Sequence, residues 1–185
     1  MPTKKVMPQP QEDEQPKNKL DAAILKVSNW LSMLFIFTVF ISFYEVVMRY
    51  AFNSPTIWVH ETASFIGGSL FVIGGLYAFA SNKHVRVVLI YDVVSQRTRH
   101  YLNLLHHIIG IIFSALMTYG AYTLVESAWF SPLGELRLNT SGSAWNPPFP
   151  ALLKAVIFIS FCILTIQFLL HLIAEIKALR KHSHV

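Results

Sequence analysis

Three charged residues lie where one long apolar stretch of this chain ends and the next begins. Glu45 and Arg49 are four residues apart, so they share one helical face, with the acid N-terminal to the base. Glu61 follows across a short turn, where the helix macrodipole favours an acid. Charged side chains inside a membrane are costly unless they are paired. The spacing therefore predicts a polar cluster of Glu45, Arg49 and Glu61 that either fixes a helical hairpin or contacts another membrane subunit.

Histidines offer a second kind of chemistry. His106 or His107 lies near the expected cytoplasmic end of one apolar stretch, and His171 lies near the cytoplasmic end of another. Two histidines at similar depth on facing helices can hold a haem between them. The simpler interpretation is that they anchor helix ends at the membrane surface. No histidine or cysteine spacing is typical of zinc, and the single Cys162 lies in an apolar stretch like any small hydrophobe. The sequence predicts no catalytic residues, no metal and no cofactor.

Composition and hydropathy indicate an integral membrane protein. Of the 185 residues, 54% are hydrophobic and only 14% are charged, whereas soluble domains carry about 25% charged residues. The mean hydropathy is +0.47. A spanning helix needs about 20 mostly apolar residues, and four stretches qualify, at about residues 25–48, 60–81, 104–127 and 151–176. The predicted fold class is an all-α integral membrane protein with four transmembrane helices.

The basic residues predict the orientation, because lysine and arginine collect on cytoplasmic flanks. Of the 15 lysines and arginines, only Arg49, Arg137 and Lys154 flank the outer loops, so both termini are expected in the cytoplasm. Residues 83–103 are expected to form a cytoplasmic connector that lies partly along the membrane surface. Residues 1–23 are expected to be a disordered tail, residues 24–178 the transmembrane domain and residues 179–185 a basic tail.

The second apolar stretch is rich in small residues, which let membrane helices approach closely. Gly68 and Gly75 are seven residues apart and lie on nearly the same helical face. The partner of this face, within the chain or in another subunit, stays open. The predicted packing face consists of Ser64, Gly67, Gly68, Gly74 and Gly75.

Four short segments carry a resemblance to a known family. They are EVVMRYAFN at 45–53, WVHE at 58–61, KHVRV at 83–87 and PPFP at 147–150, with Gln167 inside the last stretch. The segment at 83–87 is a basic cytoplasmic turn that contains Lys83, His84 and Arg86. In order and spacing, over about residues 24–178, the chain resembles the small membrane subunit (the Q or DctQ-like subunit) of tripartite ATP-independent periplasmic (TRAP) transporters.

The resemblance implies a stable complex with a much larger membrane subunit that holds the substrate and sodium sites. A periplasmic binding protein would deliver an organic acid, carboxylate or sialic-acid-like, to this sodium-coupled secondary transporter of the bacterial inner membrane. The small subunit would belong to the fixed scaffold and stabilise the large subunit in the lipid bilayer, without binding nucleic acid. Two alternatives remain open: a haem-binding membrane anchor of a redox enzyme, and a stand-alone four-helix structural protein.

Overall fold

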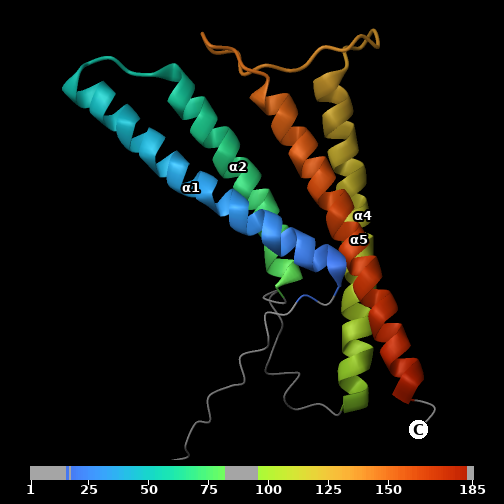
Figure 1. Cartoon of the computed structure of the whole chain (residues 1–185). Coiled ribbons are helices and arrows are strands. Elements are labelled where there is room, and N and C mark those ends of the chain that lie inside the picture. Colours follow the sequence, from blue (N-terminus) through green and yellow to red (C-terminus); the bar gives the residue numbers. More distant parts are fainter. Residues whose placement is uncertain (1–15, 17, 82–95, 183–185) are drawn as a thin grey trace, which may run out of the picture.

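Four long helices make up the computed structural model, which describes residues 16, 18–81 and 96–182 (Figure 1). They are α1 (Lys19–Ala51), α2 (Ile57–Ala80), α4 (Gln96–Trp129) and α5 (Phe149–His182). Each contains a segment that is long and apolar enough to cross a membrane. The expected all-α architecture with four helices of membrane-spanning length is confirmed.

The helix ends differ in places from the sequence-based expectation. Helix α1 begins at Lys19 and so includes residues 19–23, which we had assigned to the tail, because Asn18 caps it by accepting a hydrogen bond of 2.8 Å from the backbone N–H of Asp21. Helix α4 begins at Gln96 and takes in the end of the expected connector. The remainder of the connector at 82–95, with its expected surface segment, lies outside the described residues, as does most of the tail.

The helices form two antiparallel hairpins, α1 with α2 and α4 with α5, and the hairpins meet where α2 packs on α5 (Figure 1). At about 1.5 Å per residue, the 34 residues of α4 or α5 extend about 50 Å, beyond the hydrocarbon core of about 30 Å. In Figure 1 the lower ends of α4 and α5 accordingly continue past the end of α2. The first turns of α1 come close to α5, where Leu20 and Leu25 pack in one apolar cluster with Ile163 and Leu164 (Figure 1).

Side chains close the seam between α2 and α5 at both ends. Near the α1–α2 turn, the rings of Phe65 and Phe149 stack with centroids 4.7 Å apart. One helical turn further on, a Cβ placed on Gly68 would lie 3.3 Å from the side chain of Leu153, so the glycine admits this leucine. At the opposite end, a small apolar core includes Leu76 and Ala80 of α2.

Gly110 sets the approach of α4 to α5. A Cβ at this position would lie 2.2 Å from the ring of Phe168, so the ring occupies the space directly above the glycine backbone. Phe168 is buried and also packs on Phe79 of α2, with ring centroids 4.3 Å apart. The ring therefore has little room to move aside, and the close packing of the second hairpin depends on the absence of a side chain at Gly110.

We expect the Gly110→Ala substitution to lower the unfolding temperature of the protein in detergent, with a loss of about 1–3 kcal/mol through overpacking. The matched control is Gly120→Ala on the same helix. No atom of the described residues lies within 4 Å of a Cβ added at Gly120. Both substitutions raise helix propensity equally, so only the clash distinguishes them. Thermal unfolding followed by the fluorescence of the four tryptophans measures the difference. Equal unfolding temperatures for the two variants would contradict this account of the seam.

Candidate functional sites at the two ends of the bundle

Glu45 connects the last turns of α1 to the N-cap residue of α2. Its Oε1 accepts hydrogen bonds from Nε (3.1 Å) and Nη2 (2.6 Å) of Arg49. Its Oε2 accepts one from the backbone N–H of Thr56 (2.8 Å) and another from the Thr56 hydroxyl. Thr56 is the N-cap residue of α2, and Asn53, with a φ of 50°, reverses the chain between the helices. The carboxylate thus fixes both the end of one helix and the start of the next.

Glu61 does not join this cluster. The structure brings Glu45 and Arg49 together, and Thr56 supplies the third partner that we had expected from Glu61. Glu61 lies one helical turn further along α2 and is partly buried. Its Oε2 is fully covered, yet it has no hydrogen-bond partner among the described residues. One member of the expected three-residue cluster therefore has a different environment from the other two.

The residues of the predicted packing face are divided in the same way. Gly68 packs within the chain, on Leu153 of α5. An added Cβ at Gly67, Gly74 or Gly75 would meet no described atom within 4 Å, and Ser64 is exposed. Gly74 and Gly75 border an open apolar groove of about 580 Å³ between α2, α4 and α5. The predicted basic turn of Lys83, His84 and Arg86 lies outside the described residues.

A buried polar cluster joins α1 to α5 at the other end of the bundle. Asp21 is fully buried, with 0% of its surface exposed, and its two oxygens bind different side chains of α5. Its Oδ1 accepts a hydrogen bond of 3.0 Å from Nε2 of Gln167, and its Oδ2 lies 2.7 Å from Nε2 of His171. Gln167 and His171 are themselves buried. This Asp21–Gln167–His171 cluster is the polar contact that brings the start of α1 to α5.

The two histidines considered as haem ligands lie close together, but His171 is already engaged. Its ring packs on His107 with centroids 5.8 Å apart, and on Phe79 with centroids 4.9 Å apart. Because Nε2 of His171 is bound to Asp21, this nitrogen does not face an open site that could receive an iron atom. In the part of the chain that the structure describes, no three histidine, cysteine, aspartate or glutamate residues are grouped as metal ligands.

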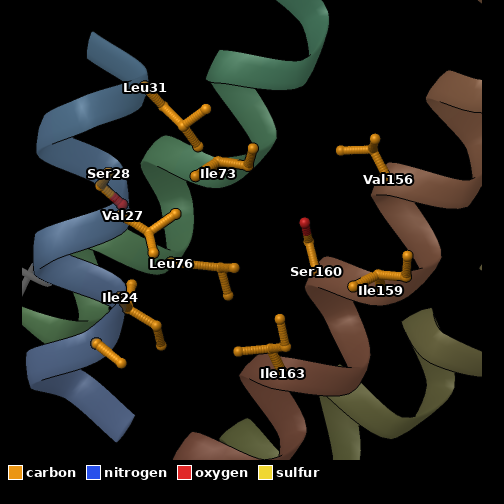
Figure 2. A pocket seen from close by; sticks show the side chains of 11 residues that line it. Ile24, Val27, Ser28, Leu31, Ile73, Leu76, Val156, Ile159, Ser160 and Ile163 are labelled. Carbon is orange, nitrogen blue, oxygen red and sulfur yellow. The ribbon is translucent and has the colours of Figure 1, made fainter.

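Above the Asp21–Gln167–His171 cluster, α1 and α5 diverge and leave an open groove of about 320 Å³ (Figure 2). Its lining comes from α1, α2 and α5 and is formed largely by aliphatic side chains such as Leu31, Ile73 and Ile163. The only polar side chains in the lining are the hydroxyls of Ser28 and Ser160. A groove of this kind suits an acyl chain or an apolar helix face and offers no counter-ion to a carboxylate substrate.

Comparison with protein families identifies the chain. Residues 38–178 match the family model of the DctQ component of tripartite ATP-independent periplasmic transporters. The chain belongs to this family. No curated protein matches it. The resemblance in the sequence motifs is thereby confirmed, and this DctQ component is a multi-pass membrane protein of a bacterial TRAP transporter, in a family without enzymatic activity. A redox anchor, the alternative derived from the histidines, is not supported.

The family match places the two sites differently. Glu45, Arg49, Gln167 and His171 lie inside the matched residues of this DctQ component, whereas Asp21 precedes them. Sequence reasoning had assigned Asp21 to the tail and missed the Asp21–Gln167–His171 cluster. Two signals were present: Asn18 and Asp21 have the spacing of a helix cap, and Gln167 and His171 are four residues apart on one face of an otherwise apolar helix.

We expect the Asp21→Ala substitution to destabilise this DctQ component by about 3 kcal/mol, because it leaves Gln167 and His171 buried without their shared acceptor. Asp21→Asn should have a smaller effect, since an amide oxygen still accepts one of the two bonds. The exposed Lys26→Ala on the same helix is the control. Thermal unfolding in detergent measures the order. If Asp21→Ala unfolds at the same temperature as Lys26→Ala, the cluster does not hold α1 to α5.

Proposed function

We propose that this chain is the small scaffold subunit of a sodium-coupled secondary transporter and that it stabilises a large transport subunit. The observation that carries the proposal is the apolar surface of α1. Of its 33 residues only Asp21, Ile24, Ile41 and Glu45 are buried. Large side chains such as Trp30 (71% exposed), Phe40 (68%) and Phe43 (67%) cover the rest of the helix. Lipid alone or a second membrane protein must cover this surface, and a TRAP system contains further subunits.

The two grooves beside the α2–α5 seam support a scaffold role better than a transport role. Both grooves beside the α2–α5 seam are lined mainly by aliphatic and aromatic side chains. An organic acid that crosses a membrane needs donors or cations along its path, because an unpaired carboxylate is costly there. We therefore assign the substrate and sodium sites to the large subunit. The substrate, an organic acid of the carboxylate or sialic-acid-like class, would be delivered by a periplasmic binding protein that docks transiently.

Affinity purification of the tagged chain from its native membrane in mild detergent tests this function. We expect a large polytopic membrane protein to co-purify in a stable ratio, with mass spectrometry as the readout. Substitution of the exposed Phe40 by Glu should reduce the recovery of that protein, because a charge in an apolar interface costs several kcal/mol. Glu126→Ala, at an exposed position of α4, is the control that should leave recovery unchanged. Recovery of a redox subunit, or of this chain alone, would contradict the proposal.

Both termini of the chain are assigned to the cytoplasm in this proposal. The excess of lysine and arginine on the two terminal segments and the middle connector supports this orientation. It places the loop between α4 and α5 in the periplasm, together with the turn between α1 and α2. In this loop, Leu133 is 87% exposed at a turn closed by Gly134, so it offers a site for labelling.

Cysteine labelling tests the orientation. In a Cys162→Ala background, we expect Leu133→Cys to react with a membrane-impermeant maleimide in intact cells. Lys177→Cys, at an exposed position near the end of α5, should react only after the membrane is opened. The opposite pattern would invert the topology while leaving the subunit assignment in place.

A further inference from the structure

Glu61 is an acid whose charge the described part of the chain does not neutralise. Its Oε2 has no hydrogen-bond partner, and no described basic residue forms an ion pair with it. The other glutamate of the same hairpin, Glu45, receives four hydrogen bonds from Arg49 and Thr56. Arg49 therefore already pairs with Glu45. Of the two glutamates of this hairpin, Glu45 is paired within the described residues and Glu61 is not. An unpaired carboxylate at the edge of a membrane is expensive to maintain.

The position of Glu61 on α2 shows which direction it faces. Phe65 lies four residues later and Gly68 seven residues later, so the three residues share one helical face. Phe65 stacks on Phe149, and Gly68 contacts Leu153. This face of α2 is therefore the one turned toward the first turns of α5. Glu61 lies on it just beyond the stacked rings, at the end of the seam that holds the α1–α2 turn.

An aromatic group begins one helical turn after Glu61 on the same face of α2, at Phe65. The ring of Trp145 meets that of Phe149 edge to face with centroids 5.4 Å apart, and Phe149 stacks in turn on Phe65. Trp145 remains 47% exposed, so this aromatic group is accessible from outside the chain. A guanidinium group can donate a hydrogen bond to a carboxylate while its flat face packs on an aromatic ring. A carboxylate on the same helical face as such rings favours arginine over the more strongly hydrated ammonium of lysine.

We propose that Glu61 binds a basic side chain of the large membrane subunit, preferably an arginine. The large subunit would insert this side chain beside Phe65, Phe149 and Trp145. This inference rests on the proposed function, because it requires a large subunit. It separates Glu61 from Glu45: the first acid binds between subunits, and the second binds within the hairpin. An ion pair at this position fixes how the two proteins are aligned, since lipid-facing apolar surfaces alone discriminate poorly between registers.

Charge reversal in the complete complex tests the ion pair between Glu61 and the large subunit. We expect Glu61→Arg to reduce co-purification of the large subunit about tenfold or more, because two cations then face each other in the interface. Glu61→Gln, which keeps the shape of the side chain, should give a smaller loss. Glu135→Arg, an exposed acid of the α4–α5 loop, is the matched control and should have no effect. Unfolding temperatures of the purified variants show whether the chain itself remains folded.

A scan of the large subunit then identifies the partner. In the Glu61→Arg background, each arginine and lysine of the large subunit is changed in turn to Glu, and restored co-purification at one position supports the proposal. Restoration by Lys154→Glu within this chain would instead reveal an internal pair and overturn it. Failure of every reversal to restore the complex would also overturn it. If the large subunit co-purifies with Glu61→Arg and Glu61→Gln as it does with the unmodified chain, Glu61 does not bind a basic side chain of that subunit. The proposed scaffold function would still stand.

If Glu61→Arg fails to accumulate in the membrane, Glu61→Gln carries the test. This variant removes the charge without adding bulk, so its folding should resemble that of the unmodified chain. Reduced co-purification of the large subunit at an unchanged unfolding temperature supports the proposed ion pair at Glu61. Unchanged co-purification overturns it. Absence of any large partner with the unmodified chain is a different result, because it contradicts the proposed function itself.

Discussion

A buried carboxylate needs donors from the protein around it, and the packing of α1 depends on how Asp21 meets this need. Its two oxygens bind Gln167 and His171 of α5, across 146 and 150 residues of sequence. Membrane helices gain little from apolar contact alone, because lipid is as apolar as the side chains. A paired acid therefore specifies the position of a helix more strictly than aliphatic packing does. Asp21 fixes the start of α1 on α5, and Glu45 fixes the other end of α1 to the start of α2.

This arrangement explains why the middle of α1 is so open. With a polar contact near each end, the helix is positioned without broad packing along its length, and between Ile24 and Glu45 it buries only Ile41. The same geometry produces the groove of Figure 2, because α1 is held to α5 at one end and diverges from it beyond that point. The apolar surface and the groove are thus consequences of where the two carboxylates sit, which leaves a long face of α1 available to lipid or to a second protein.

Hydropathy alone was sufficient to predict the four helices, because length and apolar content decide membrane insertion directly. The pairing of Glu45 with Arg49 also follows from local geometry, since residues four apart share a helical face. The bond from Glu45 to Thr56 depends on a turn in which Asn53 has a positive φ, and helix periodicity says nothing about such a turn. We therefore placed Glu61 where Thr56 lies. Asp21 escaped prediction because its partners are brought to it only by tertiary packing.

The glycines show the same limit of sequence reasoning. Small residues indicate that a helix can be approached closely, but they do not say by what. Gly68 is approached by Leu153 within the chain, whereas Gly74 and Gly75 on the same helix are not approached by any described residue. Among the glycines that the structure describes, the closest approach by a side chain is at Gly110 on a different helix, α4, where a single glycine among aliphatic residues gave no pattern. Its importance comes from Phe168, which is held in place by Phe79 of the other hairpin. Gly110 therefore affects both the α4–α5 pair and, through Phe168, the junction between the two hairpins.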